Sequence, residues 1–278
     1  MGPDLPMMPA RLKGPERVFV RVLLAILAGQ GVTARAPAQD RTGADHRLSV
    51  LAGLASVDER DALASPIRYS GAAKFLQIGY VTADPRRVIA IRLGLENGIL
   101  ASPATDPSTD LPHQESLRVW VEAEYVHRLG SGDRPFRWRA GGVLAVHVMA
   151  VDHFYATGSD FGYGLISASL APAVSVTHPV GERSSLSARL AIPLVALVGR
   201  PYGDTRLVSV GGLPLNLGSV NRFQSADLSA GFTTPLSGGL DFTLGYHLTV
   251  ERLEGSDPVR YAAQALTVEI GARLGGGS

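Results

Sequence analysis

The stretch Leu240-Asp-Phe-Thr-Leu-Gly-Tyr-His-Leu-Thr-Val-Glu251 decides the fold of this chain. Its even-numbered residues are all apolar and its odd-numbered residues are mostly polar, and this period of two predicts a β-strand. The alternation returns in 262–274, where aliphatic residues alternate with Thr, Glu, Gly and Arg. Roughly ten residues are what a tilted strand needs to cross a bilayer, whereas soluble strands cluster near five or six. The pattern therefore predicts strands that span a membrane.

The composition excludes several classes of protein. The chain has 278 residues and 45% hydrophobic residues, but no run of eighteen apolar residues follows the N-terminal region, so a helical membrane protein is not expected. A net charge of +1 gives no global case for nucleic acid. The absence of cysteine excludes disulfides, thiolate metal sites, a Cys nucleophile and a lipid-modified N-terminal Cys.

Residues 1–38 resemble a cleaved signal peptide. A basic region precedes the apolar run 22–28, and Ala36-Pro37-Ala38 supplies a small-x-small cleavage site. The basic residues are Arg11, Lys13, Arg17 and Arg21. An amphipathic or disordered tail is the alternative. We therefore expect export, a single domain over 39–274, and a flexible glycine-rich tail over 275–278.

Alternating segments recur between residues 46 and 274, and their connections alternate in length. Short connections carry Pro or Gly with polar residues, as tight turns require, at 84–87, 130–135, 179–184 and 235–239. Long connections fall near 57–70, 99–115, 151–160, 200–221 and 253–261. The ten strands expected are 46–56, 71–83, 88–98, 116–128, 136–150, 161–178, 185–199, 222–234, 240–252 and 262–274. The segment 205–218 is compatible with an outer-loop hairpin or with an extra strand pair, which would make twelve.

Each strand has an aliphatic face and a charged face, and no helical segment remains to cover one of them. Closing the sheet into an antiparallel up-and-down barrel in lipid satisfies every backbone group and leaves no edge. We expect the charged residues to line the lumen. They are Arg92, Glu96, Arg118, Glu122, Glu124, Arg137, Arg139, His147, Arg189, Asp241, His247, Glu251, Glu269 and Arg273.

Aromatic residues distinguish this barrel from a soluble one that would hold its aliphatic residues inside. Five of them share the apolar face of their strands close to a short turn, and such residues concentrate at membrane interfaces. They are Tyr80, Tyr125, Trp138, Phe232 and Phe242. We expect them to form an aromatic girdle.

Signal peptide, alternating strands and tight turns together resemble a small outer-membrane β-barrel protein of Gram-negative bacteria, across the whole mature chain. The resemblance implies outer-membrane lipid and the barrel-assembly machinery as partners, and it singles out no functional family. Such proteins usually end on an aromatic residue, whereas this chain ends Leu274-Gly-Gly-Gly-Ser278. Pro172 and Pro193 lie inside adjacent strands and predict a bulge or gap there.

The function remains open among three alternatives. The first is a non-enzymatic barrel with a self-plugged charged lumen, acting in envelope structure, surface interaction or narrow permeation. The second is an outer-membrane hydrolase at the rim, either a lipid A or phospholipid deacylase using His247 and Thr249 or an omptin-like protease using Asp152 and His153. The third is a secreted soluble barrel that binds a small apolar ligand. No metal constellation or cofactor motif is visible.

Overall fold

A computed structural model describes residues 45–62, 67–130, 135–155, 161–200, 215–219, 222–254 and 258–274. The predicted signal peptide and the glycine-rich tail lie outside the described residues. The strands are β1 (Asp45–Asp61), β2 (Tyr69–Ala83), β3 (Arg87–Asp106), β4 (Leu111–Arg128), β5 (Arg137–Phe154), β6 (Phe161–Val180), β7 (Ser184–Ala191), β8 (Val195–Gly199), β9 (Leu215–Ser219), β10 (Phe223–Pro235), β11 (Leu240–Leu253) and β12 (Val259–Leu274). One 3₁₀ turn, η2 (Ser237–Gly239), joins β10 to β11. No helix in the described part of the chain is long and apolar enough to cross a membrane.

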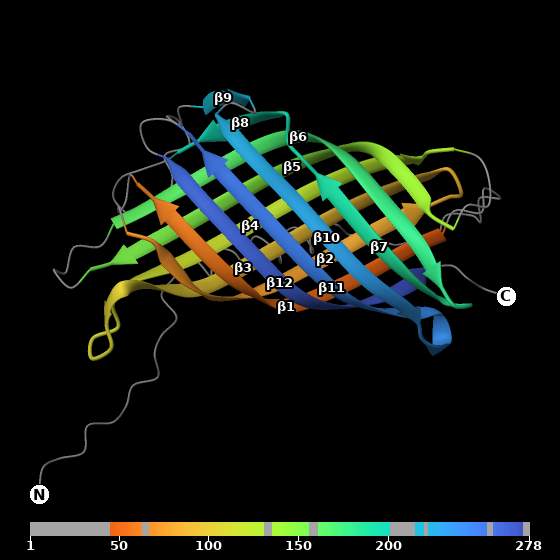
Figure 1. Ribbon diagram of the computed structural model, residues 1–278, viewed down its shortest axis with the longest axis horizontal. Coiled ribbons are helices and arrows are strands. Elements are labelled where there is room, and N and C mark those ends of the chain that lie inside the picture. The colour runs from red at the N-terminus through yellow and green to blue at the C-terminus, as the bar shows by residue number, and fades with distance from the viewer. Residues whose placement is uncertain are drawn as a thin grey trace, which may run out of the picture. The chain divides into compact units, whose positions relative to one another are not determined.

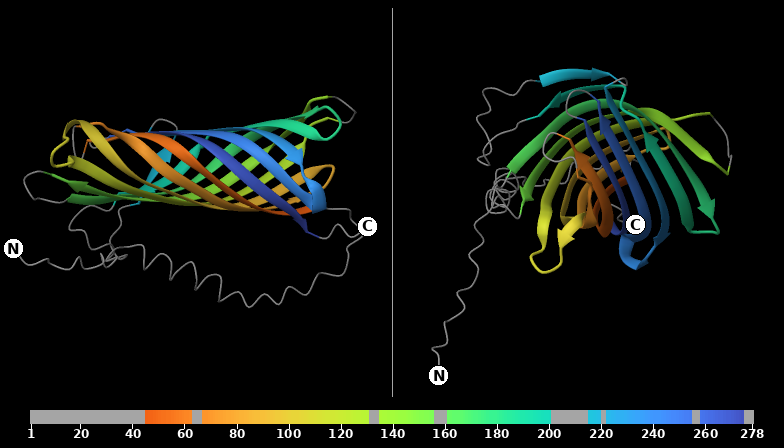
Figure 2. Two further views of the ribbon diagram at one scale, coloured as in Figure 1. Left: turned by 90° about the horizontal axis from the view of Figure 1, so that it is seen from below. Right: turned by 60° about the vertical axis from the view of Figure 1, so that its left-hand side comes forward.

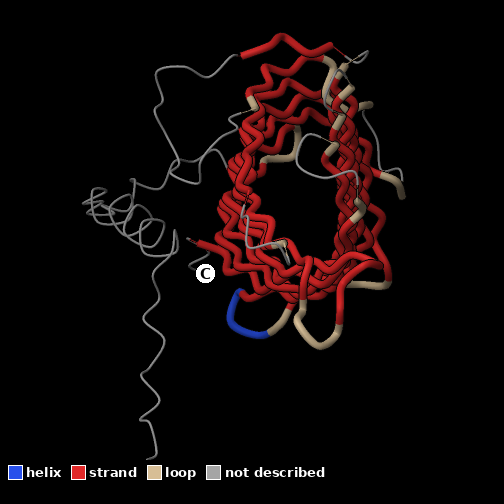
Figure 3. Tube along the Cα trace, turned by 90° about the vertical axis from the view of Figure 1, so that its left-hand side faces the viewer, coloured by secondary structure: helices blue, strands red, loops and turns tan. Residues whose placement is uncertain are grey.

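Ten of these strands close into an antiparallel barrel, as predicted from the sequence (Figures 1 and 2). Following the hydrogen bonds gives the ring β1-β2-β3-β4-β5-β6-β7-β10-β11-β12, and β12 pairs again with β1. Viewed along the barrel, the strands form a continuous wall around a central lumen (Figure 3). The strands β8 and β9 are additional to the ten, with β8 paired to β6 and β9 paired to β8.

The predicted strand 185–199 is interrupted at Pro193, and this break separates β7 from β8. The β6–β7 register pairs Ala173 with Ala191, whereas the β6–β8 register pairs Leu170 with Val195. Three residues therefore oppose two across this junction, which is the geometry of a β-bulge. Proline cannot donate a ladder hydrogen bond, so the bulge lies where the sequence predicted it.

The outward surface of the barrel is an aliphatic belt. Leu54 and Leu266 are directly paired across β1 and β12, and each side chain is 69% exposed. Exposed aliphatic residues continue around the ring on β2, β3, β4, β5, β6, β7 and β11. A soluble barrel would bury such residues, so the structure does not favour the secreted apolar-ligand barrel.

Toward the long-loop end the two faces of the wall exchange polarity. The outward positions become polar and exposed, and we call them the polar ring. They are Ser56, Lys74, Asn97, Glu115, Gln224, Arg252, Arg260 and Gln264. Many inward positions become apolar and pack into a cluster, which we call the outer apolar cluster, and buried Glu59, Asp61, Gln114 and His153 lie in the same half. The members of the cluster are Ala55, Val57, Tyr69, Ala73, Leu100, Met149, Val151, Leu165, Ala196, Val198, Phe223, Tyr261, Ala263 and Ala265. This half of the barrel is therefore built like a soluble β-protein.

This exchange corrects the predicted strand ends. Parts of the expected long connections 57–70, 99–115, 151–160 and 253–261 are strand, and the β3–β4 hairpin turns only between Asp106 and Leu111. The alternation persists in these segments, but polar residues occupy the outward positions there. Polar residues at these positions indicate loop when the sequence is taken alone, because the sequence does not show that the wall continues beyond the lipid.

The short turn between β2 and β3 is held by Asp84. Its carboxylate accepts hydrogen bonds from the backbone N–H groups of Arg86 and Arg87, at 2.7 and 2.8 Å, and from the Arg87 side chain at 2.7 Å. These bonds, the backbone ones first, hold the pKa of Asp84 below its ordinary value. An Asp side chain that accepts from the following backbone is a common device in tight turns.

The variant Asp84→Ala should lose stability in a pH-dependent manner. A depressed carboxyl pKa contributes stability that is fully present above the ordinary Asp pKa of about 4 and is lost as pH falls through the folded-state pKa. Urea unfolding in neutral phospholipid vesicles should therefore show a lower midpoint for the variant at neutral pH and a smaller difference at a pH of about 2.5. An equal difference at both pH values would contradict this role.

The aliphatic belt predicts that a charged substitution on the outward face of β12 lowers the free energy of unfolding more within the belt than beyond it. Ile270 lies within the belt, and Gln264 lies on the same face in the polar ring. Ile270→Arg should reduce the free energy of unfolding in vesicles by about 2–4 kcal/mol, and Gln264→Arg by about 1 kcal/mol or less. Equal effects of the two substitutions in urea titrations would argue against a lipid boundary between these residues.

Candidate functional site in the lumen

The lumen of the short-turn half contains a cavity of about 370 Å³. Its lining reaches Arg47, Val88 and Arg139 near the short turns, and Phe75 and Tyr261 beside the outer apolar cluster. The alternation of each strand explains this lining, because the charged residues occupy the inward positions wherever the outward positions face the belt. The cavity therefore extends from the short-turn end to the middle of the barrel.

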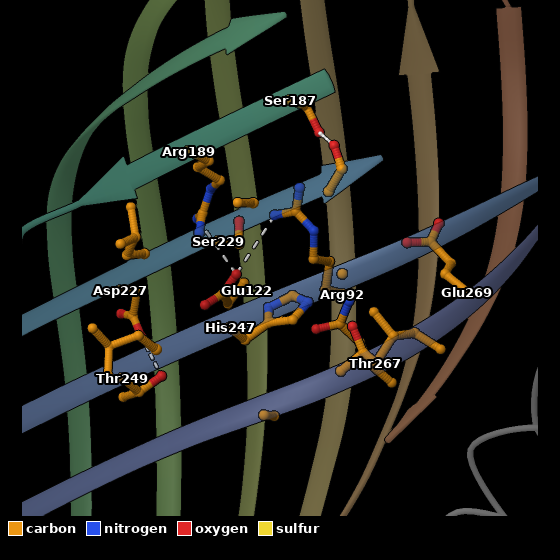
Figure 4. Close-up of a pocket in the computed structure, with 18 of the residues that line it drawn as sticks. Arg92, Glu122, Ser187, Arg189, Asp227, Ser229, His247, Thr249, Thr267 and Glu269 are labelled. Atoms are coloured by element: carbon orange, nitrogen blue, oxygen red, sulfur yellow. Dashed lines mark hydrogen bonds and ion pairs between the residues drawn. The ribbon is translucent and has the colours of Figure 1, made fainter. Parts of the chain in front are cut away.

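Two arginines share two glutamates across the cavity. Arg92 on β3 lies 2.5 Å from Glu124 and 3.5 Å from Glu122, both on β4. Arg189 on β7 lies 3.0 Å from Glu124 and 3.5 Å from Glu122. Figure 4 shows the two guanidinium groups approaching Glu122 from different walls. Paired charge of this kind is what a buried site tolerates, because each ion compensates the desolvation of another.

A second ionic group spans the barrel above the first. Arg118 on β4 bonds to Glu251 on β11, and both side chains are only 6% exposed. These strands lie five places apart in the ten-strand ring, so the pair joins opposite walls. Nδ1 of His147 lies 2.8 Å from the Arg118 guanidinium and 3.1 Å from the Glu251 carboxylate.

Tyr261 and Glu96 complete this group at the boundary with the outer apolar cluster. The Arg118 guanidinium lies 4.5 Å from the centre of the Tyr261 ring, and the Tyr261 hydroxyl donates to Glu96. A cation over an aromatic face is attracted by the ring quadrupole. The paired charges and the Tyr261 ring therefore border the end of the cavity that lies next to the outer apolar cluster.

A third set of polar residues lies on β10 and β11. Asp227 accepts a hydrogen bond of 2.8 Å from the Thr249 hydroxyl, and His247 lies directly opposite Ser229 in the strand register. The His247 ring packs against Phe75, with 5.5 Å between ring centres. Figure 4 shows Asp227, Thr249 and His247 near Glu122, with the bond between Asp227 and Thr249 drawn as a dashed line.

The predicted lumen residues differ in their surroundings. Ten line the cavity, namely Arg92, Glu96, Arg118, Glu122, Glu124, Arg139, His147, Arg189, His247 and Glu269. Glu251 is buried beneath Arg118, and Asp241 is buried beside Arg273, at 3.2 Å, near the short turns. Arg137 and Arg273 are exposed at the short-turn ends of β5 and β12.

Five ionic or aromatic residues of the lining were missing from the prediction, namely Arg47, Phe75, Trp120, Asp227 and Tyr261. Arg47 pairs with Glu269 at 2.9 Å, and Asp227 and Tyr261 take the roles described above. Strand parity was the signal that could have found Arg47 and Asp227, since each occupies an inward position of a predicted strand. Tyr261 was assigned to a connection, so its parity was not considered.

The five aromatic residues predicted to form a girdle occupy outward positions near the short-turn ends of their strands. Trp138 and Tyr125 are about half exposed, and Phe232 and Tyr80 slightly less. The Tyr80 hydroxyl also lies 2.8 Å from a ring nitrogen of His46. Phe242 is the third residue of β11 and is partly buried.

The predicted hydrolase residues do not assemble into one site. Asp152 and His153 are consecutive residues of β5, so their side chains point to opposite faces, and His153 is inward and buried. His247 and Thr249 share a face, but the Thr249 hydroxyl donates to Asp227. Among the described residues, no group of three or more His, Asp or Glu side chains is placed to hold a metal ion.

Comparisons with known proteins agree with the architecture. No protein-family model matches the chain, and no curated protein matches it. The chain is similar to the solved structure of the outer membrane protease OmpT from Escherichia coli, with a TM-score of 0.52 and 9% identity over 83% of this chain and 97% of that one. The translocator domain of the autotransporter NalP from Neisseria meningitidis gives a TM-score of 0.47 and 11% identity over 93% and 96%. Similarity at this identity concerns the fold alone, so the chain has the fold of an outer-membrane β-barrel protein.

The pair that joins opposite walls should dominate the stability of the lumen. Glu251→Gln leaves the buried Arg118 without its carboxylate, which should cost about 3–5 kcal/mol of unfolding free energy. Glu254→Gln is the matched control, because its pair with Arg252 is exposed and should contribute about 1 kcal/mol or less. Urea titrations of both variants in vesicles measure the two effects, and equal losses would contradict the assignment.

Proposed function

We propose that this protein resides in the bacterial outer membrane as a closed β-barrel that does not conduct solutes freely. The observation that carries the proposal is the outer apolar cluster, whose side chains pack together inside the long-loop half of the barrel. Its largest members, Tyr69, Phe223 and Tyr261, are at most 3% exposed. Packed apolar side chains inside a barrel obstruct the passage of ions.

The polarity of the outward surface supports the membrane location. A belt of exposed aliphatic residues suits lipid, and the aromatic residues at its short-turn edge suit an interfacial girdle. In barrels of this type short turns face the periplasm and longer loops face outward. By that rule, the polar ring and the half of the barrel that contains the outer apolar cluster face the outside of the cell.

The surface half then provides the biochemical role. The β3–β4 hairpin extends the wall beyond the belt and ends in a turn in which Ser108 bonds to Asp106 through its backbone N–H and its hydroxyl, both at 2.8 Å (Figure 1). A rigid wall that presents such hairpins suits contact with another surface, since binding residues are often held on loops by a rigid scaffold. We infer surface interaction, with envelope support, as the role of the protein.

Single-channel recording in a planar bilayer tests the closed barrel. We expect no discrete conductance steps, because the apolar side chains exclude water from half of the lumen. Insertion is verified on the same preparation by its heat-modifiable migration in detergent. Stable steps from verified, inserted protein would overturn the proposal and favour narrow permeation.

A further inference from the structure

One row of inward residues runs around the wall of the lumen near its short-turn end. Strand register places Arg128, Arg139, Ser175, Arg189 and Ser229 side by side on β4, β5, β6, β7 and β10. Directly opposed residues in antiparallel strands have Cβ atoms about 4.5–5.5 Å apart. Three guanidinium groups and two hydroxyls therefore share one strip of the wall.

Arg139 is the centre of the positive charge in this strip. It forms no ion pair with any carboxylate of the described residues, and its hydrogen bond to the Thr177 hydroxyl is 3.5 Å long. Its Nε atom is buried without a hydrogen-bond partner in the described part of the structure. Its inward neighbours are Arg128 across the strand pair and Arg137 along the strand, so like charges surround it. Arg139 is partly buried, and a cation that is shielded from water without a counter-charge is costly, so an anion would reduce that cost.

The cavity reaches this strip and brings hydroxyl groups to it. Arg139, Ser175, Thr177, Ser187 and Arg189 all line the cavity. On β5, β6 and β7 the described lining contains no Asp or Glu, whereas the neighbouring strands β3 and β4 hold three of the glutamates. The charged and hydroxyl-bearing lining of β5, β6 and β7 therefore carries only positive charge, and of its two arginines Arg189 is paired with glutamates of β4 whereas Arg139 is not.

We propose that this wall is a binding site for a phosphate-type oxyanion. Guanidinium groups donate planar pairs of N–H bonds that match phosphate oxygens, and serine and threonine hydroxyls add further donors. A cavity of about 370 Å³ has room for a small phosphorylated molecule or for a phospholipid head group. The ligand enters from the short-turn end, since the outer apolar cluster closes the other end.

The site is independent of the proposed closed barrel. A barrel that conducts can still bind an anion at Arg139, and a closed barrel can lack the site. The closed-barrel proposal and the anion-site proposal can therefore fail separately. The conductance experiment tests the first, and the binding experiment tests the second.

Calorimetric titration of the purified full-length protein with inorganic phosphate, in a neutral detergent, tests the free anion. Arg139→Gln should weaken binding about tenfold or more, because it removes a charge-assisted contact. Arg183→Gln is the matched control, since Arg183 is exposed in the turn between β6 and β7 and does not line the cavity. Its affinity should stay within about twofold of the unchanged protein. Heat-modifiable migration checks that each variant is folded, and Arg139→Lys, which keeps the charge, should retain part of the affinity.

Native mass spectrometry with phosphatidylglycerol, and phosphatidylcholine as the neutral reference, tests the lipid source. Phosphate binding that Arg139→Gln weakens supports the site with a soluble ligand. Retention of phosphatidylglycerol that the same substitution abolishes, without binding of free phosphate, supports the site with a head group as ligand. Absence of both, or binding unchanged by Arg139→Gln, overturns the proposal.

Discussion

The closing of the β-sheet on itself is the constraint on which the rest of this structure depends. Backbone N–H and C=O groups have no water to bond in lipid, so each must bond to a neighbouring strand. The pairings of β12 with β1 and of β5 with β6 complete the ring and leave no edge among the ten long strands. Once the ring is closed, every side chain must face either inward or outward, and this choice places the charges in the lumen.

The closed wall passes through two different solvents. Where lipid lies outside, ion pairs such as Arg118–Glu251 and Arg92–Glu124 hold the interior together. Where water lies outside, Leu100 and its neighbours do so by apolar packing. The interior cavity lies in the ionic half. The proposed anion site and the proposed closure therefore lie in different halves of one sheet.

Much of this arrangement could be predicted from the sequence, because period-two alternation is a local signal. It gave ten strands, the inward position of residues such as Glu122, and the bulge at Pro193. It did not give the strand extensions beyond the lipid, since polar outward residues such as Lys74 and Asn97 look like loop residues when the surrounding solvent is unknown. Pairing across the lumen was also inaccessible, because which arginine meets which glutamate depends on barrel shear and strand tilt.

The interruption between β7 and β8 has a consequence for the motions of the wall. Residues 223–226 of β10 pair with β11 on one side, but the β7–β10 ladder begins only at the pair of Asp227 with Ala191. The β8–β9 ladder begins at Val195, four residues after Ala191. Two neighbouring ladders are therefore broken at the same height, beside Pro172 and Pro193. Local opening follows the regions with the fewest shared hydrogen bonds. Amide hydrogens beside this interruption should therefore exchange with solvent before those of β1 and β12, whose ladder is continuous.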